Sequence, residues 1–356
     1  MERMVRRLLI GVAACGLLPV ATQAQQSQPL AVKPGKAFTH KHTKLQFPPE
    51  LYGMQRSRAS MLEAEELDVS AAYDTQSEAI TIYIYRDVSR ALPVWFDRAI
   101  WSIENRPKVY GALQRSPRPL PFVPPHQSAA AGLIATYTVT DSPFRSTGIA
   151  LMPLDGWFVK IRYSSASLDA DALDARIREL VTGLRWPKTV RPEPAVTPVA
   201  VCPDSLTFDG AAVPLPNTAE LALIGSVFAI PAAENGKAPP ARKPVVWCRD
   251  DGVEPKGIVY RPDGAKDAYM LAPSDAGRGI MVATDPLQQI LAKDSPAGWS
   301  IKFQHLSRTL NYQLMDRLPA PTQVIDHVNR TRPISSVTTW GKNSSVQINT
   351  DALEKK

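Results

Sequence analysis

The sequence predicts an α+β protein of two domains, in which an N-terminal antiparallel sheet flanked by helices is followed by a smaller, β-rich α+β domain. Three observations lead to this class. Residues 38–187 alternate between strand and helix patterns. Residues 187–203 hold five prolines and indicate a stiff connection. Residues 201–340 carry short strand patterns that are separated by Asp, Gly and Pro turns.

The first 24 residues have the layout of a secretory signal peptide. Three arginines precede an apolar run over residues 8–21, and small residues stand before a cut after Ala24. The segment 12–15 also resembles a bacterial lipobox, in which Cys15 is lipidated and becomes the new N-terminus. We therefore expect a secreted, periplasmic protein, with a lipid anchor through Cys15 as the alternative.

Composition narrows the partners of the mature chain. Removing residues 1–24 leaves 332 of the 356 residues, a length typical of about two domains. The formal charge of +7 falls to +5, because three arginines and one glutamate leave with the signal. This charge forms no Lys/Arg cluster, so we predict no nucleic-acid partner. The longest later apolar run, 221–233, is interrupted by Pro231 and is too short to cross a membrane, so we predict no transmembrane span.

The N-terminal half of the first domain shows strands and then a helix. Residues 25–37 are polar and are predicted to be a disordered leader. Residues 67–74 and 79–86 are predicted strands, and in the second of these isoleucines occupy one face while Thr and Tyr occupy the other. Since both faces can pack, this strand is expected to be central. The apolar spacing then changes to a helical period over 92–108.

The other half of the first domain is a loop, a strand set and a second helix. Five prolines in residues 116–125 predict an extended loop. Three strands follow, and Asp155–Gly156 is a typical two-residue hairpin turn between the last two. The helix has aspartates at its start, where they favour capping and complement the helix dipole. The expected strands are 131–140, 146–154 and 156–163, and the expected helix is 168–184.

A proline-rich linker, 188–200, is predicted to join this domain to the second one, 201–340. The second domain has a weaker pattern, and the last residues, 341–356, are polar and are predicted to be a disordered tail. Expected elements of the second domain are strands at 245–248, 257–260, 279–283 and 298–303, with helices at 285–293 and 322–330.

Two cysteines remain when Cys15 is set aside. An even count in an oxidising compartment predicts a disulfide between Cys202 and Cys248. The alternative is a pair of buried free thiols. No histidine lies near either cysteine in the sequence, so a metal site built on these two alone is not expected.

The order of elements in residues 38–187 resembles the PsbP-like domain. The resemblance is carried by the strand 80–86, by the Trp-containing strand 156–163, and by the helix 168–187 that ends in Trp-Pro. It implies an antiparallel sheet flanked by helices, of a kind common in non-catalytic subunits and assembly factors. It transfers no functional residue.

Chemical motifs are scarce in this chain. The sequence contains no nucleophile elbow, no His-Glu-x-x-His and no phosphate-binding glycine loop, so catalytic residues stay unknown and no cofactor is predicted. His40 and His42 lie two residues apart and would share one face of an extended segment, which makes them weak candidates for a metal site.

These observations favour a non-catalytic binding or assembly protein of the bacterial envelope, whose partner or ligand is unknown. One alternative is an envelope hydrolase with a site of dispersed acids and histidines at the domain junction. Another is a carrier of a small ligand or lipid, with the Tyr-lined face of residues 79–86 as one wall of its pocket.

Overall fold

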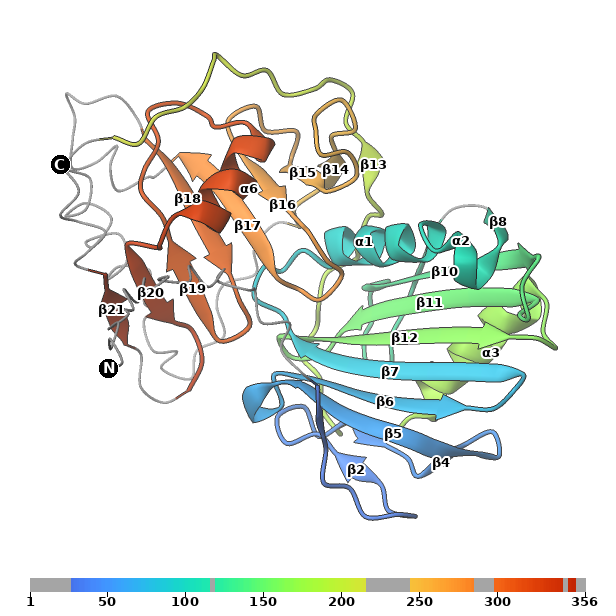
Figure 1. Cartoon of the computed structure of the whole chain (residues 1–356). Coiled ribbons are helices and arrows are strands. Elements are labelled where there is room, and N and C mark those ends of the chain that lie inside the picture. Colours follow the sequence, from blue (N-terminus) through green and yellow to red (C-terminus); the bar gives the residue numbers. More distant parts are fainter. Residues whose placement is uncertain (1–26, 116–118, 216–243, 285–297, 342–344, 350–356) are drawn as a thin grey trace, which may run out of the picture.

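The structure, a computed structural model, describes residues 27–115, 119–215, 244–284, 298–341 and 345–349. The arrangement is rich in β-sheet and has two domains, each built on one large sheet (Figure 1). The predicted signal peptide, Cys15 and the predicted helix 285–293 lie outside the described residues.

The first domain contains a ten-stranded sheet whose paired strands are all antiparallel. Along the main path the order is β1-β5-β6-β7-β12-β11-β10-β8, with β4 paired to β5 and β9 paired to β10. The strand β7 lies between β6 and β12, so the predicted central position of residues 79–86 is confirmed. The bounds are β1 Gln28–Pro29, β4 Glu50–Leu51, β5 Met54–Glu63, β6 Asp68–Asp74, β7 Glu78–Arg86, β8 Ala112–Arg115, β9 Leu120–Phe122, β10 Gly132–Thr140, β11 Ser146–Pro153 and β12 Trp157–Ser165.

Two helices pack on opposite faces of this sheet. The helix α3 (Ala170–Gly183) meets β11 at Gly148, where a Cβ would lie 2.8 Å from Ile177 Cδ1. The helix α1 (Leu92–Glu104) meets the other face, because the Arg162 guanidinium donates to the Ser102 hydroxyl. Gly148 pairs with Tyr163 across the β11–β12 ladder, and successive residues of a strand point to opposite faces. The face with Tyr83 and Tyr85 is therefore the α1 face.

Local sequence signals explain the ends of these helices. The predicted helix 92–108 is broken after Glu104, and the short helix α2 (Pro107–Tyr110) follows. Pro107 cannot donate a backbone hydrogen bond and disfavours helical geometry at the residue before it, so the first helix stops there. The predicted cap of the second helix is confirmed, since the Asp169 carboxylate accepts from the Ala172 N–H at 2.9 Å.

The hairpin turn predicted at Asp155–Gly156 is also confirmed. The two residues have φ of 51° and 82°, and Leu154 and Trp157 exchange backbone hydrogen bonds across the turn. Positive φ at both central residues is characteristic of a type I′ turn, whose backbone twist matches that of the two antiparallel strands. The turn fixes the register that places Lys160 and Arg162 on the α1 face.

The second domain contains a nine-stranded sheet in sequence order, β13 to β21. Only β13 and β14 run parallel, and the other neighbours pair antiparallel. The helix α6 (Pro321–Arg330) confirms the predicted helix 322–330, and Val324 joins its core. The bounds are β13 Ala200–Val201, β14 Trp247–Arg249, β15 Val259–Pro262, β16 Tyr269–Leu271, β17 Gly279–Thr284, β18 Trp299–Gln304, β19 Arg308–Asn311, β20 Ser335–Thr338 and β21 Val346–Ile348. Outside both large sheets, β2 (Phe38–Thr39) pairs with β3 (Gln46–Phe47), and η1 spans Ala64–Glu66.

The structure corrects three expectations about disorder and loops. In the predicted leader 25–37, β1 pairs with β5 through Gln28 and Met61. In the predicted tail 341–356, β21 pairs with β20. In the predicted loop 116–125, β9 pairs with β10 at the sheet edge, where a proline is tolerated because one side of the strand needs no donor. In all three cases the polar or proline-rich segment gains hydrogen bonds from a strand distant in sequence.

The predicted linker follows the surface of the first domain. The Arg191 N–H donates to the Asp155 carboxylate at 2.7 Å, and the Glu193 N–H donates to the Gln127 side-chain carbonyl at 2.8 Å. The Val196 N–H donates to the Ala130 carbonyl at 3.0 Å. The segment before β13 is therefore fastened to two loops of the first domain over several residues.

Candidate functional site

The two domains share one apolar core at their junction. Trp247, Tyr260 and Met270 of the second sheet belong to the same buried cluster as Trp95 on α1. Close approach depends on Gly279, where a Cβ would lie 3.2 Å from Trp95 Cη2. A shared core of this kind holds two domains together more firmly than a polar contact does. Side chains of both domains therefore meet along this junction.

A charged triad lies inside the junction. The Asp275 carboxylate, on the turn between β16 and β17, accepts from Lys160 Nζ at 3.0 Å and from Arg162 Nη2 at 2.8 Å. Lys160 is 4 % exposed. Burial lowers the pKa of Lys160, and the negative charge of Asp275 raises it, which offsets part of the effect of burial. Burial alone would raise the pKa of Asp275, but the two cations hold the pKa well below its usual range.

A second group of charges continues the triad across the same sheet face. Arg278 donates to Glu63 at 2.9 Å and lies 3.6 Å from the Asp68 carboxylate. Burial raises the pKa of Asp68 to about 6, although the positive charge of Arg278 works in the opposite direction. We call the six residues of both groups the junction cluster: Glu63, Asp68, Lys160, Arg162, Asp275 and Arg278. It holds three cations and three acids, so its formal charges balance.

A pocket of about 220 Å³ opens beside α1, at the edge of the same junction. One side comes from α1 and the other from the segment 249–257 of the second domain. We call it the α1 pocket. Its lining consists of Asp97, Ile100, Trp101, Glu104, Arg249, Asp251, Lys256 and Gly257.

The carboxylates of the α1 pocket are already held by protein donors. Asp97 accepts two hydrogen bonds from Arg249, at 2.9 and 3.0 Å, and one from the Tyr260 hydroxyl at 2.8 Å. Asp251 accepts two more from Arg249. Glu104 accepts from Arg115 and from the Tyr137 hydroxyl. Each of these three carboxylates is therefore paired with an arginine of the protein.

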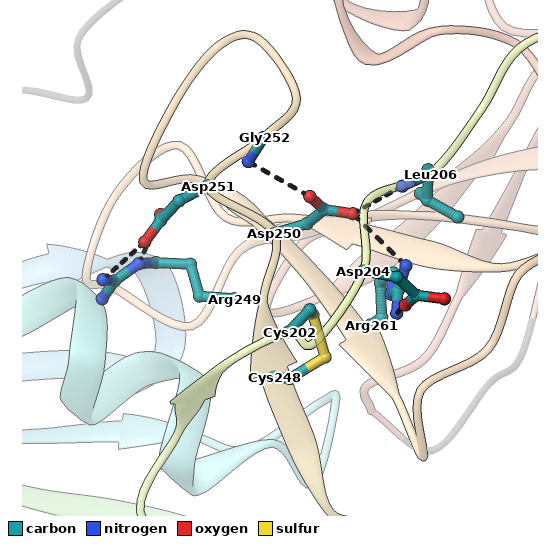
Figure 2. The surroundings of a disulfide bond; sticks show 9 residues. All are labelled: Cys202, Asp204, Leu206, Cys248, Arg249, Asp250, Asp251, Gly252 and Arg261. Atoms are coloured by element: carbon teal, nitrogen blue, oxygen red, sulfur yellow. Dashed lines mark hydrogen bonds and ion pairs between the residues drawn. A yellow bond between two sulfur atoms is a disulfide. The ribbon is translucent and has the colours of Figure 1, made fainter.

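The predicted disulfide between Cys202 and Cys248 is present and joins the end of the linker to β14 (Figure 2). Polar contacts reinforce it. The buried Asp250 carboxylate accepts from the Leu206 N–H at 2.9 Å, and Arg261 bridges Asp250 and Asp204. The disulfide and these contacts together fasten residues 202–206 to the second sheet.

The two weak metal candidates, His40 and His42, lie close together, but one ring nitrogen of each is hydrogen-bonded to a backbone carbonyl. The centroids of His40 and His42 are 5.4 Å apart. The Nε2 atom of His40 lies 2.9 Å from the Glu66 carbonyl, and that of His42 lies 2.8 Å from the Glu65 carbonyl. Both rings pack against Trp157, and His42 also contacts Trp340 from the second domain. His42 therefore contributes to the junction, whereas His40 packs within the first domain. Among the described ranges, no group of three or more His, Cys, Asp or Glu could hold a metal.

Sequence reasoning missed the residues that build the junction. Lys160 has the pattern of a solvated edge residue, yet it is buried on a strand between β7 and β11. One signal was available: Lys160 and Arg162 alternate within an otherwise apolar strand, which indicates a charged face that needs partners. Their partner Asp275 follows more than a hundred residues later, and no local pattern points to it.

Comparison of the chain with protein-family models, with curated proteins and with solved structures gave no match. Within the part of the chain that the structure describes, no helix has the length and apolar character needed to cross a membrane. A disulfide is compatible with an oxidising, extracellular compartment.

Proposed function

We propose that this chain is an exported, non-catalytic binding or assembly protein of the bacterial periplasm. Export is supported by the signal-like start of the sequence and by the disulfide between Cys202 and Cys248. Retention on the membrane through a lipidated Cys15 is the alternative form of the same proposal.

The observation that carries the binding role is the hydrogen bonding of the carboxylates at the domain junction. Glu63, Asp97 and Asp275 each accept hydrogen bonds from arginine, lysine or tyrosine side chains of the other domain. A general acid or base must lie within hydrogen-bond reach of the proton that it moves. These acids instead serve to fix two domains in one arrangement, which is the requirement for a rigid recognition surface.

The two alternatives receive less support from the same contacts. A hydrolase at the domain junction would have to use Asp97, Glu104 or Asp251, each of which is paired with an arginine side chain. A carrier would use the Tyr83 and Tyr85 face as a pocket wall. Tyr85 is fully buried, and a Cβ at Gly277 of the second domain would lie 3.1 Å from its ring, so this face is packed.

We also propose that the first domain is α+β and of the PsbP-like kind. Support comes from its antiparallel sheet, from α1 and α3 on opposite faces, and from a hairpin that leads directly into α3. The Trp186 indole after α3 donates to the Val181 carbonyl at 2.7 Å and holds the Trp-Pro end against the helix. This proposal concerns the fold alone and names no partner.

The proposed function is tested by recovering the protein from native envelope together with what it binds. The mature chain is captured under mild conditions, and co-purifying proteins and small molecules are identified by mass spectrometry. We expect a reproducible partner or ligand that the denatured protein does not retain. In parallel, the purified chain is screened against common esters, phosphates and glycosides. Turnover that a junction substitution such as Asp97→Asn abolishes would overturn the proposal and favour the hydrolase.

A further inference from the structure

Trp101 on α1 forms a fixed aromatic platform at the mouth of the α1 pocket. It is 39 % exposed, although it is a large apolar residue. The Arg98 guanidinium carbon lies 4.4 Å from the centre of the indole, and Arg98 is itself anchored by the Gly257 carbonyl at 2.6 Å. A Cβ at Gly257 would lie 3.0 Å from the indole Nε1, so the backbone packs directly on the ring. The indole is therefore oriented before any ligand arrives.

The rim around this platform carries both donors and acceptors. A carboxylate has about four lone-pair sites, and Asp251 uses two of them on Arg249, so it can accept further hydrogen bonds. Lys256 is exposed on the rim, and an ammonium group has three donors. Ile100 adds apolar surface beside the indole. The pocket thus combines one apolar wall with a ring of polar groups.

The charge pattern of the rim selects among ligand classes. A wholly apolar ligand would remove water from three carboxylates and two cations without replacing their hydrogen bonds. An anion would be repelled by the carboxylates, and a cation would be repelled by Arg249 and Lys256. A neutral molecule with one apolar face and an edge of hydroxyl groups satisfies both the indole and the rim.

We propose that the α1 pocket binds one pyranose ring of a neutral saccharide, with a C–H face of the sugar stacked on Trp101 and its hydroxyl groups bonded to the rim. This inference rests on the proposed binding function and names its ligand class. A volume of about 220 Å³ lies below the roughly 300 Å³ at which pockets for drug-sized ligands begin. One ring fills the pocket, and the rest of a longer chain extends into solvent.

The test is a titration of the mature, disulfide-bonded protein with glucose, galactose, N-acetylglucosamine and their disaccharides. Binding is followed by saturation-transfer NMR on the sugar and by calorimetry. We expect transfer to be strongest for the ring C–H protons of one face. We also expect the affinity to stay the same within about twofold when sodium chloride is raised from 0.1 to 0.5 M, because the ligand is neutral.

Matched substitutions locate the binding. Trp101→Ala is expected to weaken it at least about tenfold, a loss of about 1.4 kcal/mol. Tyr52→Ala is the control, because Tyr52 is 40 % exposed and Arg176 lies 4.6 Å from its ring centre, a similar stacking away from the pocket. Lys256→Ala changes only an exposed rim residue and is expected to weaken binding about threefold, so it keeps the test valid if the Trp101 variant fails to fold.

The outcomes separate this inference from the proposed function. If no saccharide of the panel binds at 10 mM, or if Tyr52→Ala weakens binding as much as Trp101→Ala does, the saccharide site is refuted. A partner recovered from the envelope by both the wild-type chain and the Trp101 variant would then leave the proposed function standing. Binding of a peptide or an anion in place of every saccharide also refutes the inference. Hydrolysis of a bound glycoside refutes the non-catalytic function itself.

Discussion

Replacing Asp275 by alanine removes the only side chain that the second domain contributes between Lys160 and Arg162 in the described structure. The carboxylate accepts from both cations, at 3.0 and 2.8 Å, and the backbone carbonyl of residue 275, which accepts from Lys160 at 3.1 Å, is not removed by the substitution. The variant leaves the buried Lys160 beside Arg162 with only the carbonyl of residue 275 as a hydrogen-bond acceptor among the described residues, while Arg162 keeps the Ser102 hydroxyl. We expect the folded state to lose much of its stability.

The size of the effect follows from burial. Removing one partner of a buried ion pair costs about 3–5 kcal/mol, because an uncompensated charge stays inside the protein. The Asp275 side chain is 25 % exposed, and the backbone carbonyl remains, so we expect about 3 kcal/mol. With a urea dependence of about 2 kcal/mol per molar, the unfolding midpoint should fall by about 1.5 M.

The assay is urea unfolding at pH 7.5, followed by far-UV circular dichroism and by tryptophan fluorescence. Asp326→Ala is the matched control, because Asp326 lies 3.9 Å from Arg330 with both side chains largely exposed. Such a surface pair contributes less than about 0.5 kcal/mol. A midpoint for Asp275→Ala that falls no further than that of the control would refute the reasoning. Asp275→Asn, which keeps the size of the side chain, should fall between the two.

Three further predictions concern stability. Replacing Cys202 and Cys248 together by serine should cost up to about 4 kcal/mol, since the disulfide closes a loop with a sequence separation of 46; reduction of the wild type should reproduce the loss in urea unfolding. Burial lowers the pKa of His40 to about 4, so the folded state resists protonation. The His40 contribution to stability should then fall by about 3 kcal/mol as pH drops from about 6.5 to 4, and His40→Gln should remove this part of the pH dependence relative to the wild type. Burial raises the pKa of Asp68 to about 6, so protonation of this carboxyl favours the folded state, and Asp68 contributes a gain of about 2 kcal/mol between pH 6 and 4. Asp68→Asn should therefore lose more stability than the wild type on acidification, and an unchanged pH profile in either variant would contradict the assigned cause.

Elements with a strong local pattern could be predicted from the sequence. The isoleucine alternation of residues 79–86 gave a central strand, Asp155–Gly156 gave a hairpin, and Asp169 gave a helix cap. Each of these depends on neighbours within a few residues. The cysteine pair was predictable for another reason, since an even count in an oxidising compartment leaves few alternatives.

Elements that depend on distant partners could not be predicted. Gln28 is polar and sits in a segment of low complexity, yet it pairs with Met61 because β5 offers a free edge. Lys160 is buried because Asp275 reaches it from another domain. Trp101 lies in a helix that the sequence predicts, but the Gly257 backbone that packs on its indole belongs to the other domain. In each case the deciding contact joins residues that lie far apart in the sequence.

The most direct measurement is the intact mass of the native protein recovered from fractionated cells, with and without reduction. Cleavage after Ala24 and a closed bridge predict a chain of residues 25–356 that gains the mass of two hydrogens when Cys202 and Cys248 are reduced. A chain that retains residues 1–24, is found in the cytosol and shows no mass gain on reduction would contradict both the assigned compartment and the crosslink.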